Sequence, residues 1–199
     1  MKTTIDNILE GIEIEERSPK ILQTFDQSFA SLRKRGYERH LSPEETFAVL
    51  IDAEENPDSK YKGIAGNMLS GVREWSSLAM LRLGDTLGLY WDPNLEFRNG
   101  VYVPKLGRLE YSRRETFDVR KVPSEEFVSL ERLPSKMVKL LYSRSYSKLP
   151  ERIREGAGIW MPSEGVLRPC GRGVYGNDFG VYGVYDGGAS RGVRERRQA

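Results

Sequence analysis

The stretch from residue 58 to residue 90 constrains the fold of this chain more than any other. Apolar side chains recur along it at the spacing of one α-helical face: Tyr61, Ile64, Ala65, Met68, Leu69, Val72, Trp75, Ala79 and Leu83. No other segment of the chain is as long or as periodic. The pattern predicts a helix over residues 59–83, and we expect the hydrophobic core to form on its apolar face.

The opposite face of this predicted helix carries three glycines, Gly63, Gly66 and Gly71. Each interior glycine costs a helix about 1 kcal/mol relative to alanine, so close approach by another element is one reason to keep them. Over residues 78–83 the apolar character spreads almost all round. We therefore interpret the helix as a partition between two halves of the protein, an interpretation that fails if the glycines are exposed to solvent.

Two further helices are predicted upstream. Ser18-Pro19 and Ser42-Pro43 each place an N-cap hydroxyl before a proline at the first helical position, where the missing N–H is harmless. Glu44-Glu45 completes a capping box after Ser42. The predicted helices cover residues 19–35 and 43–56, and three helices joined by short links are expected to pack as a small bundle.

After Tyr90 the composition changes toward turns and strands. Asn99-Gly100 between two short apolar segments, 95–98 and 101–103, predicts a β-hairpin, because both turn positions need positive φ. The predicted fold class is α+β. An N-terminal helical bundle of about three helices (1–90) is followed by a mixed half with a hairpin, short strands and short helices (91–190) and a fraying polar tail (191–199). The two halves are expected to share a core, and a single domain remains an alternative.

Composition excludes several kinds of chemistry. His40 is the only histidine and Cys170 the only cysteine among 199 residues, so one chain cannot assemble a Cys/His zinc site. We expect no metal and no cofactor. No apolar run approaches about 18 residues, so no membrane partner is expected. A single cysteine suits a reducing compartment, and the cytoplasm is the expected location.

A basic stretch is the first candidate for function. Residues 120–154 contain nine Lys or Arg and four Glu, and residues 142–148 interleave tyrosines, serines and cations. These residue types serve phosphate neutralisation, hydrogen bonding and base stacking. We expect a non-enzymatic binding protein that contacts nucleic acid, an acidic protein or another polyanion; a solvated helical face is the alternative interpretation of these charges. The candidate residues are Arg132, Lys136, Lys139, Tyr142, Arg144, Tyr146 and Lys148.

Two other functions stay open from the sequence. One is a metal-independent enzyme with its site in the glycine-rich segment 170–185, for which the candidate catalytic residues are Cys170, Arg172, Tyr175 and Asp178. Residues 171–176 match the spacing of a phosphate-binding glycine loop, but no helix start follows them. The other is a scaffold or assembly subunit. The sequence leaves the oligomeric state open.

Overall fold

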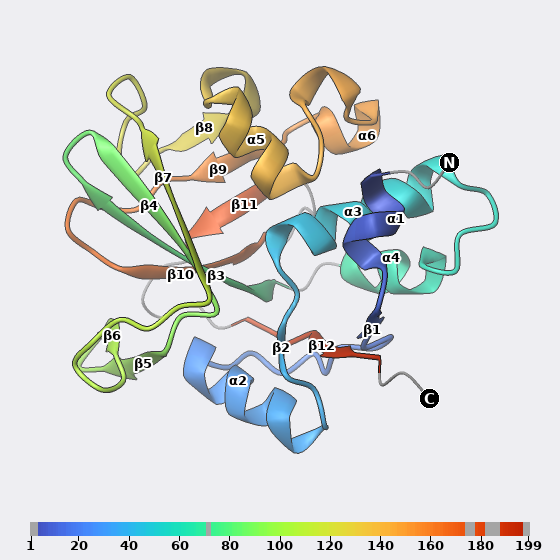
Figure 1. Ribbon diagram of the computed structural model, residues 1–199, viewed down its shortest axis with the longest axis horizontal. Coiled ribbons are helices and arrows are strands. Elements are labelled where there is room, and N and C mark those ends of the chain that lie inside the picture. Colours follow the sequence, from blue (N-terminus) through green and yellow to red (C-terminus); the bar gives the residue numbers. More distant parts are fainter. Residues whose placement is uncertain (1–3, 71–72, 174–177, 182–187, 197–199) are drawn as a thin grey trace.

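A seven-stranded sheet forms the centre of the protein (Figure 1). The computed structural model describes residues 4–70, 73–173, 178–181 and 188–196. Adjacent strands of the sheet are antiparallel except for the parallel pair β11–β9. From edge to edge the strands are β7 (Arg113–Asp118), β4 (Thr86–Trp91), β3 (Glu74–Leu83), β10 (Arg168–Arg172), β11 (Asp178–Val181), β9 (Gly158–Trp160) and β8 (Phe127–Ser129).

Two smaller sheets complete the strand structure of the described residues. A three-stranded sheet has the order β1 (Ile12–Ile14), β12 (Gly192–Glu195), β2 (Arg39–His40). The hairpin β5 (Leu95–Arg98) and β6 (Val101–Pro104) stands by itself. This hairpin confirms the prediction at Asn99-Gly100, whose φ angles are 49° and 84°.

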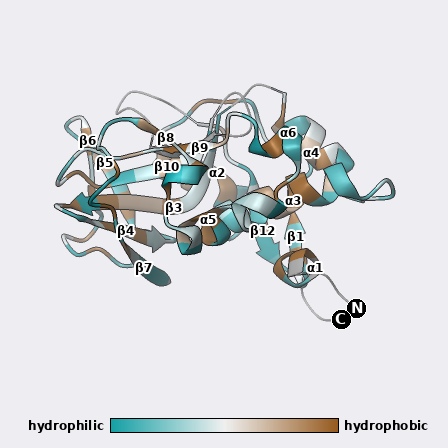
Figure 2. Cartoon of the chain, turned by 90° about the horizontal axis from the view of Figure 1, so that it is seen from above, coloured by the Kyte–Doolittle hydropathy of each residue, from teal (hydrophilic) through white to brown (hydrophobic). Residues whose placement is uncertain are grey.

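The described helices are short. They are α1 (Thr4–Leu9), α2 (Phe25–Lys34), α3 (Pro43–Glu55), α4 (Lys62–Met68), α5 (Ser135–Tyr142) and α6 (Glu151–Arg154), with 3-10 turns η1 (Leu130–Arg132) and η2 (Tyr146–Lys148). Figures 1 and 2 show α1, α3 and α4 at one end of the molecule and β4, β7 and the β5–β6 hairpin at the other. Figure 2 also shows apolar segments along α3.

The predicted fold class is wrong. The protein is mostly β-sheet with a few short helices, and the described part of residues 1–90 forms no three-helix bundle. Within residues 1–90 the capping box is as predicted: Ser42 accepts a hydrogen bond from the backbone N–H of Glu45 and begins α3. The N-terminal half therefore contributes strands as well as helices to the fold.

The long helix over residues 59–83 is the main error. Its first part forms α4, but Glu74–Leu83 is the strand β3 at the centre of the large sheet. One face of β3 places Leu78 and Met80 in the main core. The other face packs Trp75 and Ala79 against α2 and the hairpin. A strand buried on both faces shows no apolar–polar alternation, so its pattern resembles that of a buried helix.

The interpretation of residues 59–83 as a helix between two halves is wrong, because its described glycines are not covered by another element. Gly63 and Gly66 are exposed, and an added Cβ at either position would meet no atom within 4 Å. Gly71 lies outside the described residues. The central strand β3, and not a helix, has one face in each of the two hydrophobic clusters.

The predicted helix 19–35 begins later than expected. Thr24 is the N-cap of α2 and forms a capping box with Gln27, six residues beyond Ser18. Residues 19–22 are not helical, and Ile21 and Leu22 are 63% and 60% exposed. Thr24 and Gln27 therefore cap the start of α2. Ser18 does not cap a helix, because its hydroxyl donates a hydrogen bond to the carbonyl of Ser190 at 3.1 Å.

The C-terminal segment, predicted to fray, forms a strand within the described residues. Residues 192–195 form β12, the middle strand of the small sheet, which pairs with β1 and β2.

The large sheet crosses the predicted boundary at residue 90, since β3 pairs with β10. The division into residues 1–90 and 91–190 with a shared core, or a single domain as its alternative, stays a prediction. Residues 174–177 and 182–185 of the glycine-rich segment lie outside the described residues, and residues 178–181 pair as β11 with β10 and β9.

Candidate functional site

A cleft of about 860 Å³ lies where α1, the start of α3, the end of α5 and the start of β7 come together. We call it the α1–α5 cleft. Four cationic side chains line it: Arg113, Lys139, Arg144 and Lys148. Three of them belong to the basic stretch identified from the sequence, and the fold brings the fourth from β7.

The two arginines of the cleft are paired with carboxylates. Arg144 holds Glu55 through two contacts of 2.6 and 2.7 Å. Arg113 lies 3.3 Å from Glu115 and 3.7 Å from Glu44, and its guanidinium stacks over the Trp91 ring at 4.8 Å from the centroid. These contacts fix the direction of both guanidinium groups and compensate part of their charge.

The two lysines of the cleft differ from the arginines. Lys139 on α5 and Lys148 on η2 are exposed, and neither has a carboxylate partner among the residues that the structure describes. An ammonium group without a partner keeps its full attraction for an anion in solution. The cleft therefore presents uncompensated positive charge.

Apolar side chains form the floor between these cations. Ile5 of α1 is buried, while Ile8 of α1 and Leu140 of α5 are half-buried and pack against the main core. Ile5, Ile8 and Leu140 all line the cleft. The cleft thus combines positive charge with an apolar surface.

Glu44 is the one carboxylate among the described residues that line the cleft. Burial raises the pKa of its carboxyl group, and the nearby Arg113 opposes that rise. Its Oε2 atom is buried and has no hydrogen-bond partner within the described structure. Glu44 is consequently the group of the cleft whose charge changes most readily with pH.

The end of α5 is fixed against the start of α3. Ser143 follows α5 with a left-handed φ of 63°, a conformation that stops the helix and that serine adopts only with support. Its hydroxyl donates a hydrogen bond to the carbonyl of Glu44. This contact fixes the end of α5, which carries Lys139 and leads to Arg144, against the start of α3.

Four of the predicted interface residues lie outside the cleft lining. Tyr142 is fully buried: its hydroxyl donates to the carbonyl of Gly158 at 2.8 Å, and its ring stacks on Phe47 at 4.0 Å. Tyr142 is therefore a core residue without a surface for stacking a base.

The other three are at the surface. Tyr146 donates its hydroxyl to Glu131 at 2.5 Å, a hydrogen bond that raises the pKa of Tyr146, and Arg154 lies 5.8 Å above its ring. Lys136 pairs with Glu115 at 3.1 Å. Arg132 is exposed on η1.

The residues of the alternative enzyme site are placed differently. Cys170 is fully buried in β10, and burial raises the pKa of its thiol well above the usual value, which opposes thiolate formation. Arg172 is also buried, and its guanidinium donates to the carbonyls of Met68 and Gly173. Tyr175 and the side chain of Asp178 lie outside the described residues. The described part of this segment supplies no exposed nucleophile.

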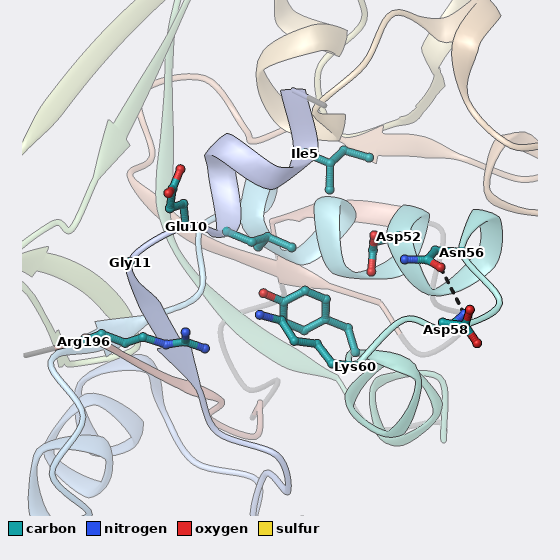
Figure 3. Close-up of a pocket in the computed structure, with 10 residues that line it drawn as sticks. Ile5, Glu10, Gly11, Asp52, Asn56, Asp58, Lys60 and Arg196 are labelled. Atoms are coloured by element: carbon teal, nitrogen blue, oxygen red, sulfur yellow. Dashed lines mark hydrogen bonds between the residues drawn. The ribbon is translucent and has the colours of Figure 1, made fainter. Parts of the chain in front are cut away.

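A second, smaller pocket of about 410 Å³ lies between α1, the end of α3 and Arg196 (Figure 3). Asp52 and Asp58 lie on one side of it, with Lys60 and Arg196 toward the other. Its charges balance more closely than those of the α1–α5 cleft. Across the described residues, no three His, Cys, Asp or Glu side chains come together in a way that could hold a metal ion.

Two residues of the α1–α5 cleft do not follow from the sequence patterns. Arg113 belongs to an Arg113-Arg114 pair that begins seven residues before the basic stretch 120–154. A basic stretch with an earlier start would have included it. Glu44 was identified as a helix-capping residue, and no local pattern shows that it also faces Arg113.

No family model and no curated protein matches this chain. One similar solved structure is described by the words "Accommodation of massive sequence variation in Nanoarchaeota by the C-type lectin fold". It is 16% identical, with a TM-score of 0.48, and the match covers 94% of this chain and 100% of that chain. A likeness of this size assigns neither a family nor a ligand. Within the described residues, no helix is both long enough and apolar enough to cross a membrane.

Proposed function

We propose that this protein is a non-enzymatic binding protein that holds an anionic partner, a nucleic acid or an acidic protein, in the α1–α5 cleft. The observation that carries the proposal is the pair Lys139 and Lys148, two cations without carboxylate partners in the described structure, facing a concave surface with Arg113 and Arg144.

Charge in a concave surface acts more strongly than the same charge on a flat one. The low-dielectric walls of a cleft focus the field of its cations and raise the local concentration of anions. The Arg144–Glu55 pair is partly exposed, so a bound anion can compete with Glu55 at little cost. Arg144 and the two lysines of the cleft are thus available to an anionic partner.

A salt series tests this function. The chain is titrated against two fluorescent polyanions, poly-glutamate and single-stranded DNA, and the anisotropy is followed from low to physiological salt. Binding driven by counterion release gives an affinity that falls linearly with salt on a logarithmic plot. Replacing Lys139 or Lys148 by glutamine is expected to reduce the magnitude of that slope by about one for each lysine replaced.

Two results would contradict the proposal: no binding of either polyanion at low salt, or an affinity independent of salt. Lys105→Gln serves as the control, since Lys105 is exposed at the end of β6 and does not line the cleft. Its salt slope is expected to equal that of the parent chain.

We further propose that the protein works in the cytoplasm. The single cysteine is buried and has no partner for a disulfide within the chain, as suits a reducing compartment. Fractionation of cells that express the full chain tests this location, and recovery from an oxidising compartment would contradict it.

A further inference from the structure

We propose that the occupant of the α1–α5 cleft is an acidic polypeptide segment that places an apolar side chain between its carboxylates. This inference rests on the function proposed above and narrows the partner from polyanions in general to one class. Three features of the cleft distinguish a polypeptide from a nucleic acid.

The apolar floor is the first feature. Ile8 and Leu140 are only half-buried, so the lining keeps apolar surface open in the same cleft as Lys139 and Arg113. A leucine or isoleucine of a peptide can cover that surface, and removing apolar surface from water favours binding. A sugar–phosphate backbone has no comparable apolar group.

The second feature is the chemistry of stacking. No aromatic side chain is among the described residues that line the cleft. Two tyrosines lie near these cations in sequence: Tyr142 is fully buried against Phe47, and Tyr146 lies outside the lining with its hydroxyl bonded to Glu131. Single-stranded nucleic acids gain much of their affinity from bases stacked on aromatic rings, and the described lining of the cleft supplies no such ring.

The third feature is the free edge of the large sheet. β7 is one of the two edge strands of this sheet, and in the described structure its backbone pairs only with β4. β7 starts at Arg113, which lines the cleft. A polypeptide that leaves the cleft along β7 therefore meets unpaired backbone N–H and C=O groups, which can accept an added strand.

Matched probes test the inference. Three are compared at one salt concentration: a glutamate-rich peptide with a central leucine, the same peptide with serine in place of leucine, and a single-stranded DNA of equal charge. The leucine peptide is expected to bind about tenfold more tightly than the serine peptide, as burial of part of one leucine side chain allows. The DNA is expected to bind no better than the serine peptide.

The outcomes separate this inference from the proposed function. Equal affinity of the leucine and serine peptides, or tighter binding of the DNA, would contradict the proposal of a polypeptide partner. The proposed function, salt-dependent binding of a polyanion, would not be contradicted by either result. If none of the three probes binds at low salt, the proposed function fails as well.

Two variants test whether the leucine of the peptide contacts the apolar lining of the cleft. Leu140→Ser is expected to remove most of the advantage of the leucine peptide, because Leu140 lines the cleft. Leu106→Ser is the control, since Leu106 is 78% exposed and is not part of the cleft lining. Circular dichroism of both variants verifies folding, and the comparison of the two peptides on the parent chain needs no variant. An unchanged leucine advantage in folded Leu140→Ser would contradict the inference.

Discussion

Glu74 holds Arg191 through two contacts, Oε1 to Nη2 at 2.8 Å and Oε2 to Nε at 3.2 Å. The two residues are 117 positions apart in sequence, and only 6% and 1% of their surfaces are exposed. Arg191 also donates to the carbonyls of Glu15 and Glu16 and to the side-chain oxygen of Asn67, at 2.6, 2.9 and 2.7 Å. One guanidinium group thus joins the start of β3 to the end of α4 and to the segment after β1.

Removing this guanidinium is expected to destabilise the fold strongly. Arg191→Gln leaves the buried Glu74 carboxylate and two carbonyls with fewer donors, and breaking a buried pair costs about 3–5 kcal/mol. Arg194→Gln is the matched control, because Arg194 pairs with Glu13 at the surface and such pairs contribute little. Urea denaturation compares the free energies of unfolding, and equal losses in the two variants would contradict this role of Arg191.

The stability of the fold is expected to fall in acid because of His40. His40 is fully buried beside Phe25 and Phe29, and burial lowers its pKa from 6.5 to about 3. Its Nε2 lies 3.1 Å from the hydroxyl of Ser28. Because the unfolded chain binds the proton more readily, this contribution is present above pH 6.5 and is lost as the pH falls toward 3.

The slope of that loss is roughly 1.4 kcal/mol per pH unit between the two pKa values. Denaturation curves of the parent chain and of His40→Gln, measured across this range, separate the histidine from the acidic groups. The variant is expected to be less stable at neutral pH but to lose stability less steeply. Parallel curves would show that His40 does not set the slope.

The burial of Tyr142 predicts that its hydroxyl serves stability and not binding. Tyr142→Phe removes the hydrogen bond to the Gly158 carbonyl and is expected to cost about 1 kcal/mol of stability. Its affinity for polyanions is expected to equal that of the parent chain. Tyr146→Phe, which removes only a surface hydrogen bond to Glu131, is the control and should melt as the parent does. Weaker polyanion binding by folded Tyr142→Phe would contradict this prediction and show that the Tyr142 hydroxyl takes part in binding.

Glu44 is expected to make binding depend on pH. Burial raises the pKa of Glu44, so on acidification it takes up a proton before an exposed glutamate does and leaves the cleft more positive. A sulfated polyanion, whose own charge does not titrate, is expected to bind about fivefold more tightly once this charge is removed. Glu44→Gln should bind more tightly already at neutral pH and gain little on acidification. The same gain in both proteins would exclude Glu44 as its source.

Elements determined by local chemistry were predictable from the sequence. The capping box at Ser42 and the Asn99-Gly100 turn depend on residues within a few positions of each other, and both appear as expected. The strand β3 was not predictable in this way, because two different clusters bury its two faces. The strand β12 carries one buried apolar side chain, Val193, and forms because β1 and β2 flank it.

The candidate site likewise contains residues that local sequence predicts and residues that only tertiary contacts bring in. Lys139, Arg144 and Lys148 follow from the local density of charge in residues 120–154. The contributions of Arg113 and Glu44 come from tertiary contacts between β7, α3 and α5. The sequence indicated cations of the site, but the fold determines which of them keep carboxylate partners.

Charge reversal inside and outside the α1–α5 cleft tests the proposed binding site most directly. The double variant Lys139→Glu/Lys148→Glu is compared with Lys105→Glu/Lys121→Glu, which changes the net charge equally through exposed lysines that do not line the cleft. Affinity for poly-glutamate is measured by anisotropy at one salt concentration. The cleft variant is expected to bind about tenfold or more weakly than the parent chain, while the control stays close to it. Equal weakening in the two variants would show that net charge alone attracts the polyanion and would contradict a binding site in the cleft.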